Sequence, residues 1–398
     1  MSYRVALSVG EFRAVFTAYV TSSVSLNITM LTLAVLVYER TTSPLLSALT
    51  FTLSFLPHLI SGTVLGGLID RWPVRRLLVG AEVVGAVAVL VMVVPGVPTT
   101  VLLVLLFCMN LPVPLASGAR GALIADILPA EGVVAGRSLL RIVSQAAQIV
   151  GYAIGGSLVA WMSVQGALLV AGGTFLCGAV VLFLAIHPRA AQGVPSESLA
   201  RDSLRGVREV FALPRVRRVM VFMWMVPFFT VWPEALGPPY VTSLGLPSSV
   251  SGWWLVTVST GTVVSEVVGV FFLPFVRRHV RTLATVAFMP LLVFVGQPGF
   301  PYALTLLTVM GLCSAYLLGL DQELLDAIPE DKRGRVYSLT STGLLVTQGV
   351  GFALSGALTE VLPPYVVIVV AGVGGLLTVR VLRNGALPGH QGAPSHPG

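Results

Sequence analysis

Long apolar stretches separated by short polar ones dominate this chain. Twelve stretches approach or exceed the roughly 20 apolar residues that a helix needs to cross a bilayer. They lie near residues 14–38, 45–69, 77–95, 99–119, 138–161, 166–186, 217–241, 250–276, 282–297, 301–322, 337–360 and 364–382. The apolar positions run on without alternating, which argues against strands. The pattern therefore predicts an all-α polytopic membrane protein with twelve transmembrane helices.

One long polar segment, residues 187–216, divides these stretches into two groups of six. We expect an N-terminal six-helix half over residues 1–186, a cytoplasmic linker over 187–216 and a C-terminal six-helix half over 217–383. Residues 384–398 are rich in Pro, Gly and His and predict a disordered tail. The two histidines of this tail do not form a convincing metal-binding pattern.

The two halves repeat each other at an offset of 200 residues. The matches are strongest around the fifth and eleventh stretches, where they include Asp126 with Asp326, Pro129 with Pro329, Gln148 with Gln348, Gly151 with Gly351 and Gly156 with Gly356. Such tandem six-helix repeats, lying in the same orientation, are typical of one large class of secondary transporters. The repeat predicts a transport pathway between two pseudo-symmetric halves.

Composition and charge place the chain in a membrane. Charged residues make up only 10% of it and the mean hydropathy is +0.91, against about 25% charged residues in soluble domains. If the N-terminus is cytoplasmic, 23 of the 24 Lys and Arg residues fall on the cytoplasmic side, and only Arg40 does not. Cytoplasmic loops are enriched in Lys and Arg, so we expect both termini in the cytoplasm of a multi-pass inner-membrane protein. The net charge of +7 then reflects topology and does not indicate a nucleic-acid partner.

The sequence offers no pattern for enzymatic or metal chemistry. Cys108, Cys177 and Cys313 lie within apolar stretches without metal-ligand spacing and are expected to pack against neighbouring helices. There is no Walker loop and no histidine box. Residues 1–13 are too short and mixed for a signal peptide. We therefore expect no enzymatic activity, no cofactor and no metal.

Several local motifs resemble those of the major facilitator superfamily of transporters. They are Gly66-Gly67-Leu68-Ile69-Asp70-Arg71 with Arg75-Arg76 after the second stretch, Leu36-Val37-Tyr38 with Thr42-Ser43-Pro44 after the first, Ala119-Arg120-Gly121-Ala122-Leu123-Ile124-Ala125-Asp126 after the fourth, and Arg333-Gly334-Arg335-Val336-Tyr337 before the eleventh. With the repeat and the hydropathy pattern, the resemblance covers nearly the whole chain. It is closest to the bacterial branch of macrolide-efflux and siderophore-export proteins, and it implies the twelve-helix fold of that superfamily.

The resemblance implies a conformational latch at the cytoplasmic ends of the helices. Asp70 is expected to meet the positive N-terminal end of the eleventh helix, which is a stabilising geometry. The charged groups around it would hold the halves together when the pathway opens outward. The latch set is Gly67, Asp70, Arg71, Arg75, Arg76, Arg120, Asp126, Asp326 and Arg335.

Gly151, Gly155 and Gly156 in the fifth stretch resemble the antiporter motif that is associated with exporters in this superfamily. Tyr152 stands where that motif has proline. The alternative is a generic packing face of small residues. Many proton-coupled relatives also carry an arginine midway along the fourth helix. This sequence has only Asn110 there, so that motif gives no support for proton antiport.

Four ionisable residues inside the apolar stretches are candidates for chemistry, since a charged side chain there is costly and usually functional. Glu266 is the deepest, and it could couple transport to protons or form a structural hydrogen bond. Glu234 could line a vestibule or reach water, and Glu82 fits an inner charge network better than a transport role. His58 can titrate near neutral pH or bond to a neighbouring helix. All four remain candidate coupling groups.

Five uncharged amide side chains are candidates for a central substrate cavity, although they could equally bond across helices. They are Asn27, Asn110, Gln145, Gln148 and Gln348.

Together these features predict a secondary transporter that exports a small amphipathic organic compound, such as an antibiotic, another natural product or a siderophore. We expect alternating access by rocking of the two halves, coupled to protons, in a monomer whose partners are the small-molecule substrate, protons and membrane lipids. The alternative on the same fold is an importer of a small nutrient or a lipid translocator. The sparse charge within the stretches mildly favours an apolar or weakly polar substrate.

Overall fold

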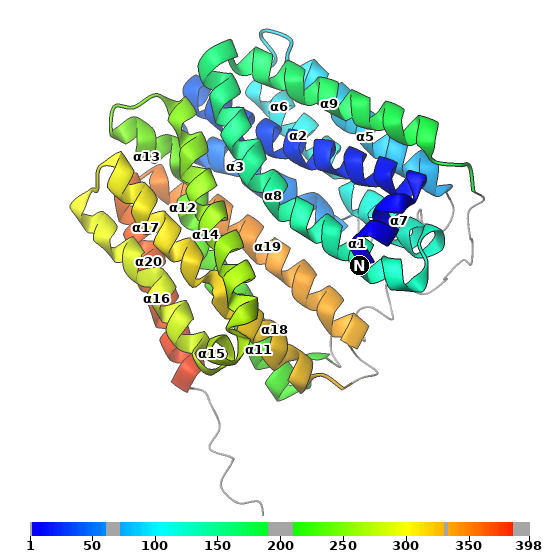
Figure 1. Ribbon diagram of the computed structural model, residues 1–398. Coiled ribbons are helices and arrows are strands. Elements are labelled where there is room, and N and C mark those ends of the chain that lie inside the picture. The colour runs from blue at the N-terminus through cyan, green and yellow to red at the C-terminus, as the bar shows by residue number, and fades with distance from the viewer. Residues whose placement is uncertain (1, 61–71, 190–209, 330–332, 385–398) are drawn as a thin grey trace, which may run out of the picture.

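The computed structural model describes residues 2–60, 72–189, 210–329 and 333–384. Every regular element in these ranges is helical (Figure 1). The first group of helices is α1 (Ser2–Ser8), α2 (Gly10–Thr41), α3 (Pro44–Ile60), α5 (Val74–Met92), α6 (Thr99–Asn110), α7 (Val113–Ile127), α8 (Ala130–Met162) and α9 (Val164–Ala185).

The second group follows the linker. It consists of α11 (Pro214–Thr230), α12 (Trp232–Ala235), α13 (Gly237–Ser243), η2 (Ser248–Val250), α14 (Ser251–Phe271), α15 (Leu273–Arg278), α16 (Val280–Leu292), η3 (Val293–Gly296), α17 (Phe300–Leu312), η4 (Cys313–Ala315), α18 (Tyr316–Ala327), α19 (Arg333–Thr359) and α20 (Pro364–Asn384). We call the helices α1–α9 the N-half and α11–α20 the C-half.

The described part of each of the twelve predicted stretches coincides with one helix or with a helix broken into consecutive pieces. Within the described residues, eight helices are long and apolar enough to cross a membrane, and the bent pair Pro214–Ala235 and Gly237–Ser243 makes a ninth. The others are shorter or, like α5, carry charges near one end. The prediction of an all-α membrane fold is confirmed.

Proline accounts for the main breaks. Pro112 lies between α6 and α7, so the fourth stretch continues as a second helix to Ile127. The seventh stretch contains Pro227, Pro233 and Pro238, and its two parts meet at 45°. Proline removes a backbone donor and disfavours a straight helix, and in a membrane the freed carbonyls need other partners. Trp254 supplies one, since its indole nitrogen donates to the carbonyl of Pro233 at 2.8 Å.

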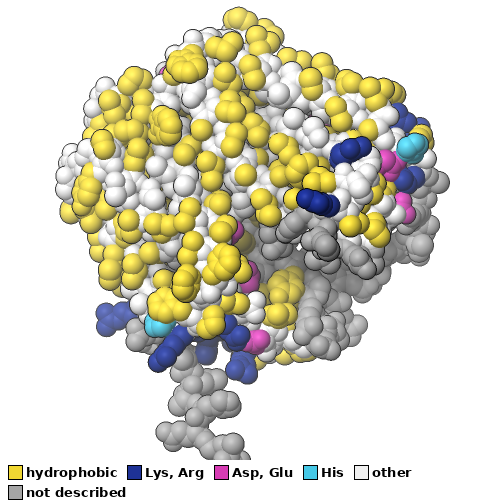
Figure 2. All heavy atoms as spheres, in the orientation of Figure 1, with side chains coloured by type: hydrophobic (Ala, Val, Ile, Leu, Met, Phe, Trp, Pro, Cys, Tyr) yellow, Lys and Arg dark blue, Asp and Glu magenta, His cyan; other side chains and the backbone are white. Residues whose placement is uncertain are grey.

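The two halves meet along two helix pairs, α3 with α19 and α8 with α14. We call the end of the bundle where α1 begins and α20 ends the terminal face, and the opposite end the far face. Lys and Arg side chains gather along the lower and right edges of Figure 2, while apolar side chains cover much of the rest of the visible surface. Large exposed apolar groups such as Phe271 and Leu184, 79% and 76% exposed, fit a lipid-facing surface.

Candidate functional site

A cavity with two lobes lies where the halves meet. The N-lobe, about 330 Å³, is lined mainly by N-half helices. The C-lobe, about 280 Å³, is lined mainly by C-half helices. Phe55, Gln145 and Gln148 line both lobes, so the two lobes are neighbours between the halves. Binding cavities of comparable size, apolar with a few placed polar groups, are typical of small-molecule sites.

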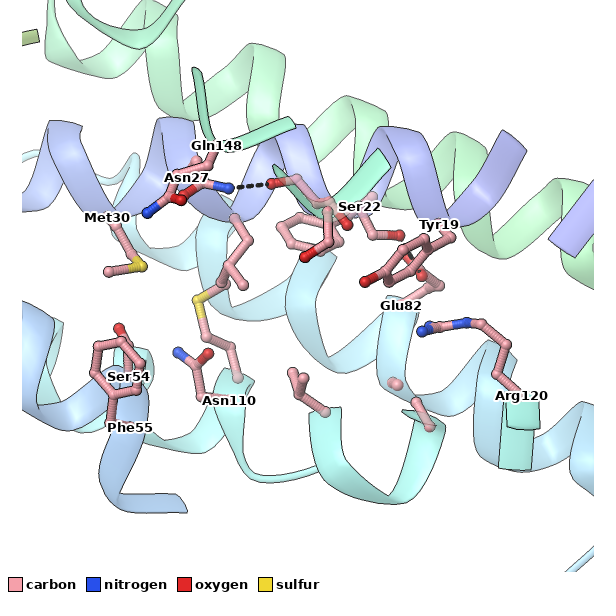
Figure 3. A pocket seen from close by; sticks show the side chains of 18 of the residues that line it. Tyr19, Ser22, Asn27, Met30, Ser54, Phe55, Glu82, Asn110, Arg120 and Gln148 are labelled. Carbon is pink, nitrogen blue, oxygen red and sulfur yellow. Dashed lines mark hydrogen bonds between the residues drawn. The ribbon is translucent and has the colours of Figure 1, made fainter. Parts of the chain in front are cut away.

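The carboxylate of Glu82 and the guanidinium of Arg120 face each other across the N-lobe (Figure 3). The two groups do not form a direct ion pair. Ser22 donates a hydrogen bond to one oxygen of Glu82. The other oxygen, Oε2, is buried and has no hydrogen-bond partner among the described residues. The guanidinium of Arg120 lies 4.1 Å above the ring of Tyr19, where a cation is favourably placed. An unpaired carboxylate oxygen in a low-dielectric site is costly, so Glu82 is suited to take up a proton or a cation.

Local packing makes room for this carboxylate. Glu82 lies on α5 and packs against α9 at Gly178, where an added β-carbon would be only 3.0 Å from Glu82 Oε2. On α2, Tyr19, Ser22, Asn27 and Met30 share one helical face toward the lobe. The sequence therefore places a small residue opposite the acid and a polar stripe beside it.

The C-lobe contains a second carboxylate. Glu234 lies in the four-residue helix α12, at the break in the seventh stretch, and lines the lobe. Tyr316 and Phe352 also line it, and Phe352 stacks on Phe55 with ring centroids 5.6 Å apart. The lobe is thus an aromatic-walled space with one acidic group.

The five predicted cavity amides all line the cavity, although no observation tests a role for them in binding. Asn27 and Asn110 line the N-lobe and donate to backbone carbonyls of their own helices, at 2.8 Å in each case. Gln145 and Gln148 line both lobes, and Gln348 lines the C-lobe.

The four candidate coupling residues lie in different surroundings. Glu82 lines the N-lobe and Glu234 the C-lobe. Glu266 on α14 accepts a hydrogen bond from Gln145 of α8 at 3.1 Å and so joins the two halves. His58 belongs to α3, but its side chain lies outside the described residues. Their coupling roles stay predictions.

The latch residues that the structure describes make contacts within their own half. Asp126 pairs with Arg189 at 3.0 Å, and Arg189 also binds Glu11. Asp326 pairs with Arg277 at 2.6 Å. Its bonds to Glu11 and Asp126 raise the pKa of the Arg189 guanidinium.

The remaining members of the latch set fall into three groups. Arg75 lies 4.2 Å above the ring of Phe183 and donates to its carbonyl, while Arg76 is exposed. Arg120 lines the N-lobe instead of the helix ends, because α7 continues past it to Ile127. Gly67, Asp70 and Arg71, and the side chain of Arg335, lie outside the described residues. A latch between the halves stays a prediction.

The antiporter-like glycines lie at close helix crossings. A β-carbon at Gly151 would be 2.5 Å from the β-carbon of Asn27 on α2, and one at Gly155 would be 3.2 Å from Ile28 Cα. At Gly156 it would be 3.1 Å from Gly252 Cα on α14, in the other half. The motif therefore packs α8 both against its own half and against the partner half.

The contacts of these glycines repeat at the 200-residue offset. Gly351 of α19 packs against α11 at the carbonyl of Phe228, as Gly151 of α8 packs against α2. Gly356 of α19 packs against Leu45 of α3, across the halves, as Gly156 does against α14. The sequence repeat thus corresponds to a repeat of helix contacts.

The far face is closed by bonds between the halves. Glu360, after α19, accepts hydrogen bonds from the Ser43 hydroxyl and, at 3.0 Å, from the Leu45 backbone at the start of α3. Glu39, near the end of α2, accepts from Ser248 at the start of η2. These bonds join the halves at the far face, and the bond of Gln145 to Glu266 joins them deeper in the bundle. This conformation is therefore sealed at the far face.

Sequence reasoning missed Tyr19, Ser22, Glu39 and Glu360. The first two could have been found from the polar spacing along residues 19, 22, 23 and 27, which marks one face of a helix. The two glutamates lie at stretch ends and look like ordinary solvated charges in the sequence.

Comparison with known proteins settles the family. The family model of the major facilitator superfamily matches residues 15–320. The chain belongs to the major facilitator superfamily. It is a transporter and not an enzyme, and it crosses the membrane several times.

Relatives of this major facilitator protein include named efflux proteins. It is 22% identical over 354 residues to macrolide efflux protein A of Streptococcus pyogenes, covering 83% of this chain and 85% of the relative. It is 23% identical over 369 residues to the multidrug efflux pump Tap of Mycolicibacterium fortuitum, covering 88% and 90%. The similarity to these two proteins extends over most of both chains, at low identity.

Solved structures share the fold. A mutant of the nucleoside transporter NupG superposes with a TM-score of 0.74 at 11% identity, over 94% of this chain and 99% of that one. A POT family transporter in complex with 5-aminolevulinic acid superposes with a TM-score of 0.71 at 10% identity, over 94% and 95%. At these identities the likeness establishes the architecture alone.

Proposed function

We propose that this transporter exports a small amphipathic organic compound from the cytoplasm, driven by proton entry. The observation that carries the proposal is the two-lobed cavity, whose walls are apolar and aromatic around a few polar groups, among them Glu82, Arg120 and Glu234. Such walls suit a molecule with a large apolar body. The named efflux relatives support the export direction.

In the proposed mechanism, the terminal face is the cytoplasmic one, as the distribution of Lys and Arg favours. The conformation described above, sealed at the far face, would receive substrate from the cytoplasm or the inner leaflet. Release outside requires the contacts of Gly156 with Gly252 and of Glu360 with α3 to separate. The cavity would then open to the far face while the terminal face closes.

Three carboxylates are available for proton coupling. Glu82 and Glu234 face the cavity, and Glu266 bonds to Gln145 of the other half, so its protonation state can change a contact between the halves. A carboxylate that takes up a proton from the far side and loses it at the terminal side would couple the gradient to the conformational change.

The test is uptake of radiolabelled compounds into inverted membrane vesicles with an imposed pH gradient. The panel comprises macrolides, other amphipathic antibiotics and siderophores, and the variants are Glu82→Gln, Glu234→Gln and Glu266→Gln beside wild type. We expect gradient-dependent accumulation of at least one compound, lost in at least one variant. Absence of accumulation for the whole panel would refute the export of such compounds. Full activity in Glu266→Gln would remove Glu266 from the coupling role.

A further inference from the structure

The two lobes differ in charge. In the N-lobe, Glu82 has Arg120 as a nearby cation. In the C-lobe, the lining residues that the structure describes include Glu234 but no Lys, Arg or His. The Glu234 carboxylate also has no hydrogen bond or ion pair with another described residue. The C-lobe therefore carries one acidic group that lacks a counter-ion among the residues that the structure describes.

The backbone fixes the position of this acid. Glu234 lies between Pro233 and the bend before Gly237, in a segment too short to shift as a regular helix. The carbonyl of Pro233 is held by the buried indole of Trp254 at 2.8 Å. A carboxylate on such a fixed segment is preorganised for a ligand, because little conformational entropy is lost on binding.

The surrounding walls suit an organic cation. Phe55, Phe352 and Tyr316 line the same lobe and present aromatic faces or edges to it. A cation near an aromatic face is stabilised by the ring, and more strongly when water is excluded. The hydroxyls of Ser259 and Thr262 add acceptor oxygens without adding charge.

We propose that the C-lobe is a subsite for the cationic group of an amphipathic substrate, with Glu234 as its counter-ion. The apolar body of the same molecule would extend past Gln145 and Gln148, which line both lobes, into the N-lobe. The inference deepens the proposed function and rests on it, since it names the class of molecule that is exported, an organic cation with a bulky apolar part.

The test compares two ions of nearly the same shape and opposite charge. Equilibrium binding of tetraphenylphosphonium and of tetraphenylborate is measured on the purified full-length protein in lipid nanodiscs. We expect wild type to bind the phosphonium saturably and to prefer it over the borate. Glu234→Gln should weaken phosphonium binding about tenfold or more, because a charge-assisted contact in a dry site is lost. Glu234→Asp should retain part of the preference.

Glu323→Gln is the control, since Glu323 is an acid of the same half that is bonded to Arg281 and lines neither lobe. Its phosphonium affinity should stay within about twofold of wild type. A measurement on wild type alone guards against misfolding of the variants. Tetraphenylphosphonium should slow the reaction of Glu234 with dicyclohexylcarbodiimide, followed by mass spectrometry, and tetraphenylborate should not.

The subsite is overturned if Glu234→Gln binds the phosphonium as wild type does, if wild type binds it no better than the borate, or if the phosphonium leaves the carbodiimide reaction unchanged. These outcomes are separable from the direction of transport. Phosphonium binding through Glu234, without gradient-driven accumulation in inverted vesicles, would leave the subsite standing and contradict export.

Discussion

The crossing of α8 and α14 at the far face yields a quantitative prediction. Here Gly156 and Gly252 let two helices of opposite halves touch along their backbones. A β-carbon at residue 252 would lie 2.9 Å from Gly156 Cα and 3.0 Å from the Tyr152 carbonyl. Ordinary contacts of this kind are about 3.5–4.0 Å, so Gly252→Ala forces the helices apart by roughly 0.5–1 Å.

The cost of such overpacking is about 1–3 kcal/mol. It falls on the conformation that is sealed at the far face, because the two helices separate there when the cavity opens outward. Gly252→Ala should therefore shift the equilibrium toward the outward-open conformation by about 5- to 150-fold.

The assay is a pulsed electron spin resonance distance between spin labels at Thr100 and Gln297, exposed residues at the far ends of the two halves. The labels are attached to cysteines in a background without Cys108, Cys177 and Cys313. Gly252→Ala should enlarge the population with the longer distance. Gly173→Ala is the control, since a β-carbon there meets nothing within 4 Å. Identical distance distributions in wild type and Gly252→Ala would refute the reasoning.

Three further predictions use other contacts. Glu360→Gln removes the charge that caps the start of α3. A partly exposed charge at a helix N-terminus contributes about 0.3–1 kcal/mol, so the variant should shift the spin-label equilibrium toward the outward-open conformation by about two- to fivefold. An unchanged distance distribution would show that this bond does not hold the far face closed. Arg189→Gln loses contacts to both Glu11 and Asp126. Asp326→Asn loses one ion pair, whose side chains are 47% and 57% exposed and which contributes at most about 1 kcal/mol. Thermal melting in detergent should therefore show Arg189→Gln to be the less stable variant, and the reverse order would contradict this. Gly178→Ala places a methyl group 3.0 Å from Glu82 Oε2 and should reduce transport into vesicles. Its purification yield should match that of the control variant Gly173→Ala. Normal transport would mean that the position of Glu82 is not important.

Hydropathy predicted the fold because each membrane helix makes its backbone hydrogen bonds within itself. Such a helix therefore appears in the sequence as one local apolar stretch. The same reasoning led to the expectation that five amides line a central cavity, since polar amides in apolar stretches seek partners inside the bundle. Each of the five lines one lobe or both, and their role in substrate binding stays a prediction.

Hydropathy failed where a partner in three dimensions decides the outcome. The sequence pattern ends the fourth stretch at residue 119, because Arg120 breaks the apolar run. The helix continues to Ile127, and Arg120 faces the cavity because Tyr19 and Glu82 offer it a ring and a negative charge. An arginine therefore does face the cavity from the fourth span, nearly three helical turns beyond Asn110 at its midpoint.

Glu266 illustrates the opposite limit. Depth in its stretch made it the foremost coupling candidate, but depth does not reveal orientation. The structure directs its carboxylate to Gln145 of the other half and leaves Glu82 and Glu234 to line the lobes. The choice among the three depends on contacts between helices that no local pattern encodes.

The central claim, proton-driven export, is tested most directly by comparing inverted vesicles that are acidic inside with inverted vesicles that are acidic outside. Both preparations receive the same radiolabelled amphipathic compound. The account predicts accumulation only where the lumen is acidic, because protons that leave the lumen drive the compound in, and collapsing the gradient should abolish it. Accumulation only where the exterior is acidic would contradict the account and indicate a proton-coupled importer.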